Sequence, residues 1–227
     1  ARDYQERLDR ARVVGNEQAF LIGVRVLSDT ISAAKAGSAY ALVAKSLIAE
    51  MALAAEAEHA RRHGQMPGGA AAVIAMGKLG GDEMAANSDL DLIVVYDFAA
   101  GAPQSEGAKP LPGLQYYTRL TQRLVAAIAA PTAEGRLYEV DMRLRPSGTS
   151  GPGASHIDSF TTYQREAAWT WEHMALTRAA VIAGPEPLRR RIEAVIGAVL
   201  VRPRRRETLV SDVREMRARI AALSVPA

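Results

Sequence analysis

Two aspartates separated by a single residue, Asp89 and Asp91, are the feature of this sequence that most directly indicates chemistry. They stand in residues 88–92, Ser-Asp-Leu-Asp-Leu, at the start of an apolar run that ends at Tyr96. Residues i and i+2 of a β-strand point to the same face, so an extended segment places both carboxylates side by side. Two adjacent anions repel each other unless a cation lies between them. Oxygen ligands at this spacing suit Mg²⁺, which binds carboxylates together with substrate phosphates.

An Asp-x-Asp pair alone is also typical of a solvated strand end, and here its context favours the metal. Gly77 follows a short apolar run and precedes Asp89 by twelve residues, while Gly80 and Gly81 favour a tight turn into a short helix. Glycines at such a turn let backbone N–H groups approach phosphate oxygens, and a helix N-terminus adds a favourable dipole. The segment therefore predicts a phosphate-binding turn before the acid pair.

A third acid, Asp141, lies in a segment that alternates between apolar and polar residues. In a strand over residues 137–145, Asp141 shares one face with Glu139, Arg143 and Arg145. Three carboxylates with two arginines are what phosphoryl transfer from a metal-bound nucleotide requires.

The N-terminal part of the chain, which must support these groups, has a helical pattern. Apolar residues recur at helical spacing over residues 1–64, with Asn16 and Ser38 as N-caps and Gly64 as the stop. One predicted apolar stripe consists of Phe20, Val24, Leu27 and Ile31. We expect residues 1–66 to form a helical layer packed on the catalytic module.

The central part of the chain changes to strand patterns. Apolar runs over residues 71–76 and 90–96 predict strands. Residues 98–113 are rich in Gly and Pro and predict a mobile loop, and a helix follows at about 114–130 before Pro131. A catalytic domain over residues 67–184 is expected.

The last part of the chain is predicted to be helical. Ser155 followed by Asp158 resembles a capping box, and the helical stretch after it runs to about Ala183 and stops at Gly184. Residues 185–227 are basic and helical in pattern, and we expect them to begin a further helical domain that is cut off. Because the chain lacks an initial Met and a leader pattern, we also expect it to be a piece of a longer protein without a signal peptide.

Composition and charge exclude several classes of protein. Hydrophobic residues make up 48% and charged residues 23%, and no apolar stretch is long enough to span a membrane, which predicts a soluble protein. The absence of cysteine excludes disulfides, thiolate nucleophiles and Cys-type zinc sites. The net charge is only +3, but seven arginines fall within residues 189–206. This stretch is either a solvated helix face or a dock for an acidic partner, and without interleaved aromatics nucleic acid is disfavoured.

Together the motifs resemble a known superfamily. A glycine after an apolar strand, an Asp-x-Asp pair and a distant third Asp are similar to the nucleotidyltransferases that include DNA polymerase beta and kanamycin nucleotidyltransferase. Lys78 departs from the Ser or Gly usual there and points to one branch. Residues 77–81 (Gly-Lys-Leu-Gly-Gly), Glu83, residues 88–92 and residues 140–146 (Val-Asp-Met-Arg-Leu-Arg-Pro) resemble glutamine synthetase adenylyltransferase over nearly the whole chain.

This resemblance implies a substrate and a reaction. The family has two homologous halves, one adding AMP to glutamine synthetase and the other removing it by phosphorolysis. Residues 145–148 and 169–178 resemble the C-terminal, adenylylating half. The implied reaction moves AMP from ATP to a tyrosine hydroxyl of glutamine synthetase in the cytoplasm, and the implied further partner is the PII signal protein.

The resemblance also implies a role for each candidate residue. Asp89 and Asp91 would hold two Mg²⁺ ions, with Mn²⁺ as the alternative, and Asp141 would complete the site of the metal that binds the attacking oxygen. A tyrosine hydroxyl, with a pKa of about 10, needs such a metal to favour its ionised form at neutral pH. Asp141 is also a candidate proton acceptor. The expected nucleotide-binding residues are Gly77, Lys78, Gly80, Ser88, Arg143 and Arg145.

Structural roles compete with several of these assignments. Lys78 is alternatively a surface cation, Ser88 a strand-entry cap and Glu83 an acid in the first turn of a helix. Arg143 and Arg145 either clamp phosphate or pair with nearby acids.

A segment rich in aromatic residues is expected to form one helix. Trp169 and Trp171 are predicted to pack in the core, and His173 to be a hydrogen-bonded core histidine rather than a base or ligand. Glu172 and Arg178 form a candidate ion pair, although a separation of six residues is poor for pairing on one helix.

The sequence thus predicts an α+β nucleotidyltransferase fold, with a small mixed sheet carrying three acids and flanked by helices. The adenylyl-removing half of the same enzyme is the nearest rival function. A template-independent nucleic-acid nucleotidyltransferase would use the arginine cluster to hold a strand. A regulatory module that binds nucleotide without turnover is the third alternative, and the intact acids argue against it.

Overall fold

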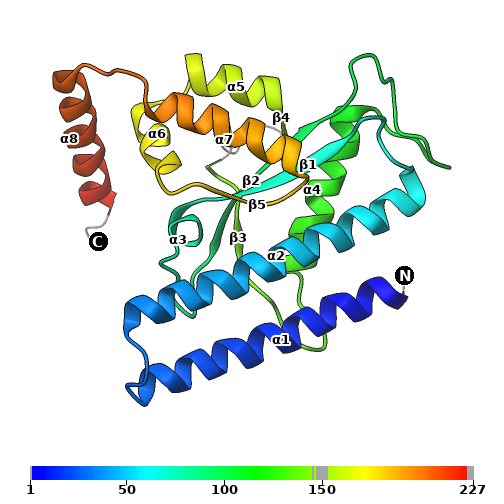
Figure 1. The fold of residues 1–227 in the computed structure, drawn as a ribbon, viewed down its shortest axis with the longest axis horizontal. Coiled ribbons are helices and arrows are strands. Elements are labelled where there is room, and N and C mark those ends of the chain that lie inside the picture. The colour runs from blue at the N-terminus through cyan, green and yellow to red at the C-terminus, as the bar shows by residue number, and fades with distance from the viewer. Residues whose placement is uncertain (1, 145, 147–152, 224–227) are drawn as a thin grey trace.

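The computed structural model describes residues 2–144, 146 and 153–223. They form an α+β fold in which a small mixed sheet has helices on both faces (Figure 1). The elements in chain order are α1 Arg2–Leu27, α2 Ala33–His63, β1 Ala70–Ala75, α3 Gly77–Gly80, β2 Leu90–Asp97, α4 Gly113–Ala129, β3 Val140–Asp141, β4 Ser155–His156, α5 Ile157–Glu166, α6 Thr170–Leu176, β5 Ala180–Ala183, α7 Glu186–Leu200 and α8 Arg206–Leu223. The predicted fold class is confirmed.

The sheet is built around the hairpin of β1 and β2. Its order is β3-β2-β1-β5, with β4 also paired to β2, and β1 runs antiparallel to β2 and β5. Both β3 and β4 lie parallel to β2 at its other edge, β3 beside Leu90 and Asp91 and β4 beside Val95 and Tyr96. The start of β2 is therefore the place where β3 can bring a further side chain next to the acid pair.

Side chains of β2 alternate between two buried faces of the sheet, as the two-residue period of a strand requires. Leu90 and Leu92 pack in the core formed with α1, α2 and α4, whereas Ile93 and Val95 pack with α5, α6 and α7. Burial on both faces explains why the strand reads as an almost continuous apolar run. Asp91 has the same parity as Ile93, so it belongs to the second face.

Helix α2 is the long central support of the first face. It contacts α1, α4 and β5, and its buried residues include Ile48 and Met51. Its length and hydropathy would suffice to cross a membrane, but these contacts are those of a core helix. The predicted stop at Gly64 is confirmed, with Gly64 at φ 70°. The cap at its start is Ser32, whose side chain accepts a hydrogen bond from Lys35 N.

The predicted details of the N-terminal helices were partly wrong. Asn16 lies inside α1 and Ser38 inside α2, so neither is an N-cap. The proposed stripe is exposed, with Phe20 70% and Leu27 88% accessible. The buried side of α1 instead carries Arg12, which is 0% exposed. Its guanidinium donates to four backbone carbonyls, those of Leu8, Ala127, Ala130 and Gly135.

The second face of the sheet is covered by α5 and α7, and here the prediction of one long helix was wrong. Residues 155–183 divide into β4, α5, α6 and β5. The N-cap of α5 is His156 rather than Ser155. Strand β5 pairs antiparallel with β1 and ends at Ala183, before Gly184, whose φ is 116°. A four-residue strand that forms only against a distant partner leaves no helical or alternating pattern long enough to identify it.

Two further predicted segments differ in the structure. The strand predicted over residues 137–145 is reduced to the two residues of β3. The loop after β2 is tied down by hydrogen bonds, from Glu106 N to Gln65 O, from Lys109 N to Arg62 O and within the loop from Ser105 N to Leu111 O. The predicted helix after it is confirmed as α4, which ends before Pro131.

Candidate active site

The three predicted acids come together where β1, β2 and β3 meet. Asp89 directly precedes β2, and Asp91 is its second residue. In the parallel pair of β2 and β3, Asp91 lies opposite Asp141. Backbone hydrogen bonds fix this alignment, from Leu90 N to Glu139 O and from Met76 N to Asp91 O, each 2.9 Å.

Gly77 allows the chain to turn directly over the acid pair. Its φ is 55°, a left-handed conformation that favours glycine. A Cβ atom at this position would lie 2.4 Å from Asp91 Oδ2. The turn after β1 therefore needs glycine for two independent reasons, its backbone conformation and its approach to the Asp91 carboxylate.

The electrostatics of the site show an accumulation of negative charge around Asp91. Burial raises the pKa of Asp91, and the charges of Asp89 and Asp141 raise it further, while Arg143 and Lys78 act in the opposite direction. Asp91 is half-buried and Asp89 is exposed. A carboxylate whose ionised form is disfavoured in this way gains from a nearby cation.

Arg143 holds the carboxylate of Asp141. The Arg143 backbone N donates to Asp141 Oδ1 at 2.8 Å, and Arg143 Nε donates to Asp141 Oδ2 at 2.7 Å. The Asp141 carboxylate raises the pKa of the Arg143 guanidinium, first through the hydrogen bond and then through its charge. Of the two predicted roles for Arg143, pairing with a nearby acid is the one present here. The Arg143 side chain is 77% exposed, so it also borders the open side of the site.

The chemistry of this donor set fits a divalent cation. Asp89, Asp91 and Asp141 supply hard oxygen ligands from adjacent strands, and their mutual repulsion raises the pKa of Asp91. Among the described residues, no three Asp, Glu or His side chains already stand as a ready-made ligand cluster, and Asp141 is engaged by Arg143. Metal binding would thus require these carboxylates to rearrange.

The other predicted nucleotide-binding residues have distinct positions. Lys78 is exposed on α3, within electrostatic reach of Asp91. Ser88 is buried, and its Oγ accepts a hydrogen bond from Ala85 N at 2.9 Å, as a strand-entry cap would. At Gly80, a Cβ atom would lie 1.9 Å from the carbonyl oxygen of Arg178, so glycine is needed there for packing. Arg145 lies outside the described residues.

An ion pair that the sequence did not reveal supports the glycine turn. Arg178 Nη2 lies 2.5 Å from Glu83 Oε2. Glu83 follows α3, so it is not an acid in the first turn of a helix. The predicted partner of Arg178, Glu172, instead accepts hydrogen bonds from Tyr163 Oη at 2.7 Å and Trp169 N at 2.9 Å. A separation of 95 residues between Glu83 and Arg178 leaves no local signal that could have identified their pairing.

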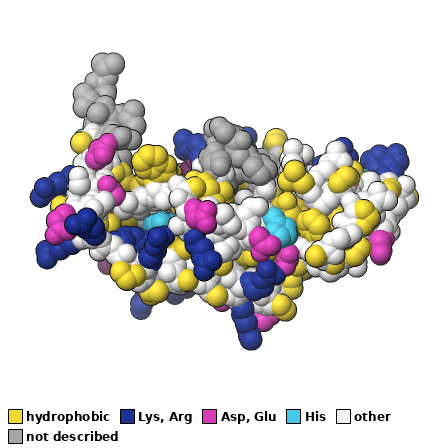
Figure 2. Space-filling view, turned by 90° about the horizontal axis from the view of Figure 1, so that it is seen from above, with side chains coloured by type: hydrophobic (Ala, Val, Ile, Leu, Met, Phe, Trp, Pro, Cys, Tyr) yellow, Lys and Arg dark blue, Asp and Glu magenta, His cyan; other side chains and the backbone are white. Residues whose placement is uncertain are grey.

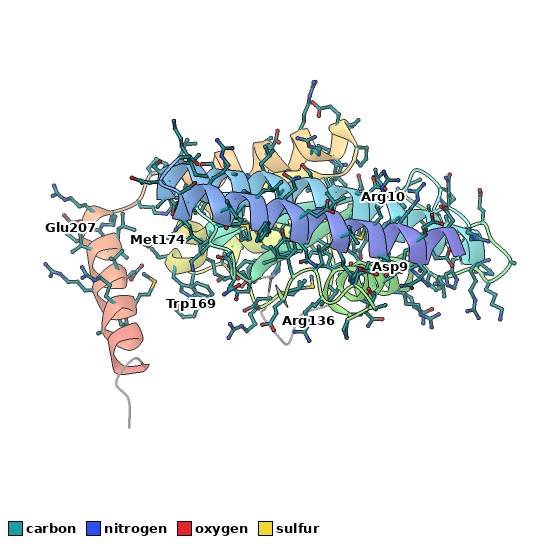
Figure 3. The ribbon with its side chains drawn as sticks, turned by 90° about the horizontal axis from the view of Figure 1, so that it is seen from below. Asp9, Arg10, Arg136, Trp169, Met174 and Glu207 are labelled. Atoms are coloured by element: carbon teal, nitrogen blue, oxygen red, sulfur yellow. The ribbon has the colours of Figure 1, made fainter. Side chains whose placement is uncertain are left out.

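The aromatic segment is more exposed than predicted. Trp169 is 71% and Trp171 42% exposed, so neither packs in the core. Figure 3 shows Trp169 and Met174 together at the end of the molecule near α8. His173 is half-buried and hydrogen-bonded, with Nε2 2.9 Å from Gln164 O and Nδ1 3.0 Å from Arg204 Nη2. The prediction of a hydrogen-bonded histidine is confirmed.

A small mixed sheet with helices on both faces, carrying acids at the start of its central strand, is an α+β fold of the nucleotidyltransferase type. The family model for glutamate-ammonia ligase adenylyltransferase matches residues 1–195. The chain therefore belongs to this enzyme family.

Individual relatives agree with the family assignment. Three proteins named bifunctional glutamine synthetase adenylyltransferase/adenylyl-removing enzyme are similar to this chain. The one from Brucella suis biovar 1 (strain 1330) is 53% identical over 100% of the chain. Those from Bradyrhizobium sp. (strain ORS 278) and Xanthobacter autotrophicus (strain ATCC BAA-1158 / Py2) are 52% and 54% identical over 98% and 96% of it. The chain spans 23% of the Brucella relative's length and 22% of the other two.

Proposed function

We propose that this chain transfers AMP from ATP to a tyrosine hydroxyl of glutamine synthetase. The observation that carries the proposal is the convergence of Asp89, Asp91 and Asp141 on paired strands, with Lys78 and Arg143 beside them. The name of the relatives indicates an adenylyl group as the transferred group and glutamine synthetase as the acceptor protein. In this proposal the tyrosine oxygen attacks the α-phosphorus of ATP, a new P–O bond forms, and the bond to pyrophosphate breaks.

The proposed roles of the chain's own residues follow from their positions. Asp91 and Asp89 would hold the cations beside the triphosphate, and Asp141 would accept the proton of the tyrosine hydroxyl. Bound Mg²⁺, or Mn²⁺ in its place, would neutralise phosphate charge and favour the ionised hydroxyl. Lys78 and Arg143 are cationic and exposed, and they would bind the phosphates that leave as pyrophosphate.

The backbone around the glycine turn supports the same assignment. Because Gly77 has no side chain, the turn lies directly against the Asp91 carboxylate, and phosphate oxygens bound there would lie next to the backbone N–H groups of the turn. Ser88 and Gly80 would then act mainly by shaping the turn, since both are engaged in local packing. Arg145 is proposed as a further phosphate ligand from the family resemblance alone.

The adenylyl-removing reaction is the second candidate, because the relatives' name includes both activities. We favour addition of AMP because residues 145–148 and 169–178 resemble the adenylylating half. From the same resemblance, we propose the PII signal protein as a regulator and the cytoplasm as the location.

Radiolabel transfer tests the proposal directly. The chain is incubated with ATP labelled at the α-phosphate and with purified, unmodified glutamine synthetase. We expect label on a glutamine synthetase tyrosine and release of unlabelled pyrophosphate. Phosphate-dependent release of ADP from adenylylated glutamine synthetase, without the forward transfer, would assign the chain to the removing reaction. In a parallel incubation with RNA in place of glutamine synthetase, incorporation of label into the RNA would favour the nucleic-acid alternative.

A further inference from the structure

A cavity lies at the other end of α2 from the acid cluster. The start of α2 packs against α3 and the segment that follows it, next to the glycine turn, since a Cβ atom on Gly37 would lie 3.3 Å from Met84 O. The end of α2 lines a cavity of about 660 Å³ together with α1, α4 and the loop before α4. Gly37 and His59 are 22 residues apart in one unbroken helix, about 33 Å along its axis. Figure 1 shows α3 near the start of α2 and the loop before α4 near its end, so the cavity at that end is separate from the proposed nucleotide site.

The cavity is lined by positive charge. Arg62, Lys109, Arg119 and Arg123 contribute cations from three elements, and none of the described lining residues is Asp or Glu. Within the part of the chain that the structure describes, none of these four cations forms an ion pair with a carboxylate. Their mutual repulsion is therefore not relieved by a lining carboxylate.

Nearby acids do not neutralise this charge. Glu58 pairs with Arg61 at 3.3 Å rather than with a lining cation. Glu56, seven residues before the end of α2, adds to the effect of burial in raising the pKa of Tyr116, but it does not line the cavity. Tyr4 also lines the cavity, and the charge of Arg123 acts on its hydroxyl. A neutral hydroxyl leaves the positive charge of that guanidinium in place.

His59 provides a second, independent observation. It is only 1% exposed, and neither of its ring nitrogens has a hydrogen-bond partner. Its ring lies against His63 and Tyr116, with ring centroids 4.6 Å and 4.5 Å away. Buried Arg123 Nε also lacks a partner. A buried polar group without a partner costs about 1–3 kcal/mol, so unpaired groups at one cavity indicate an occupant that would satisfy them.

The pKa of His59 reflects the same excess of positive charge. Burial lowers its pKa to about 4, with further contributions from His63, Arg123 and Arg119, while the Tyr116 backbone opposes them weakly. A bound anion would reverse the contributions of these neighbouring charges and favour the protonated ring.

We propose that this cavity binds a small anion carrying at least two negative charges, as phosphate esters and polycarboxylates do. Arg62, Arg119 and Arg123 would pair with its oxygens, and His59 would donate a hydrogen bond to it. The volume lies within the range of small-molecule sites, about 300–1,000 Å³. Partly apolar walls, which include Leu8 and Leu111, suit an organic anion.

Labelled histidine makes the proposal testable because the chain contains only four histidines. The chain labelled with ¹⁵N-histidine is titrated with inorganic phosphate and, separately, with citrate, at an ionic strength held constant with sodium chloride. Each resonance is assigned by substituting the histidines by glutamine one at a time. We expect saturable shifts of His59 and a higher His59 pKa in the bound state. Saturation by citrate alone would indicate the polycarboxylate class, and saturation by phosphate alone the phosphate class.

Substitutions separate this site from general electrostatics and from the proposed active site. Arg119→Gln, at an exposed position, should weaken binding about tenfold, the equivalent of about 1.4 kcal/mol. Lys109→Gln in the loop is the second variant should Arg119→Gln fold poorly. Arg190→Gln, an exposed arginine paired with Glu186, and Lys78→Gln at the nucleotide site should leave the affinity unchanged. Shifts that never saturate, or that Arg190→Gln weakens as much as Arg119→Gln does, would overturn the proposal.

Discussion

At the scale of single residues, Asp91 is the group on which the proposed chemistry most depends. Asp91→Asn preserves its shape and removes one ligand charge, so AMP transfer should fall by at least about a hundredfold. The metal-free protein should be at least as stable as the parent, because burial and the neighbouring acids disfavour the ionised Asp91 carboxylate. Radiolabel transfer and thermal unfolding measure the two effects.

The matched control for this variant is Asp158→Asn, whose carboxylate is 79% exposed on α5. It should retain normal transfer. Near-normal turnover in well-folded Asp91→Asn would mean that Asp91 is not a metal ligand.

Gly77 offers a test of the turn itself. Gly77→Ala should destabilise the fold by about 1–3 kcal/mol, because alanine at this φ is strained and its Cβ would meet the Asp91 carboxylate. Gly197→Ala is the control, since it lies within α7 with no atom within 4 Å of the added Cβ, and helix propensity predicts a gain of about 0.5–1 kcal/mol. Urea unfolding of both variants gives the comparison, and equal stabilities would contradict it.

His59 should make stability depend on pH. Its folded pKa is lowered from 6.5 to about 4, so the unfolded chain binds a proton more readily than the folded one. The resulting stability is fully present above pH 6.5 and is lost as the pH falls from there toward 4. Between pH 7.5 and 5.0 we expect a loss of about 2 kcal/mol from this group. Urea unfolding of the parent and of His59→Gln at both pH values should show a smaller loss in the variant, and identical losses would exclude the assignment.

At the scale of elements, local patterns predicted the parts of the fold that depend on nearby residues. Sequence patterns could identify β1, β2 and the helix after Pro112, because their apolar runs are long enough to be recognised. Strands β4 and β5 were missed because they exist only through pairing with β2 and β1.

The candidate site divides in the same way. Asp89 and Asp91 are neighbours in one strand, so the sequence could predict that they act together. Asp141 was predicted from its motif, and its place opposite Asp91 depends on strand pairing. The ion pair of Glu83 with Arg178, and the exposure of Trp169, arise from tertiary packing that no local pattern encodes.

The joint between α1 and α4 provides a prediction at this scale. Arg12 is fully buried and donates to Ala127 O and Ala130 O at the end of α4 as well as to Gly135 O. Arg12→Met should cost about 3 kcal/mol, because it leaves these buried carbonyls without their donor. Arg10→Met on the exposed side of the same helix (Figure 3) should change stability by less than about 0.5 kcal/mol. Chemical denaturation measures both, and a small cost for Arg12→Met would show that water replaces the guanidinium.

At the scale of the whole molecule, the arginines of residues 189–206 differ in whether they already have a partner within the chain. Arg190 pairs with Glu186, Arg191 with Asp97, and Arg202 donates to a backbone carbonyl. Figure 2 shows basic and acidic side chains interleaved on the face where α5 and α7 lie. Arg205 and Arg206 at the start of α8 are exposed and form no ion pair among the described residues.

These two arginines are therefore the ones we expect to attract an acidic surface of glutamine synthetase. The double variant Arg205→Gln/Arg206→Gln should raise the KM for glutamine synthetase a few-fold and flatten its salt dependence, with little change in the KM for ATP. Arg190→Gln, already paired within the chain, is the control. A loss of ATP affinity with an unchanged response to glutamine synthetase would assign the arginines to the nucleotide site instead.

Helix α2 has 31 residues, with one end at the glycine turn and the other at the cationic cavity. Thermodynamic linkage makes any communication along such a helix reciprocal. If citrate in the cavity changes the dissociation constant of ATP by some factor, ATP must change that of citrate by the same factor. Titrating ATP with and without citrate, and citrate with and without ATP, would therefore measure the same coupling free energy twice. A coupling free energy of zero would mean that the two sites at the ends of α2 are uncoupled.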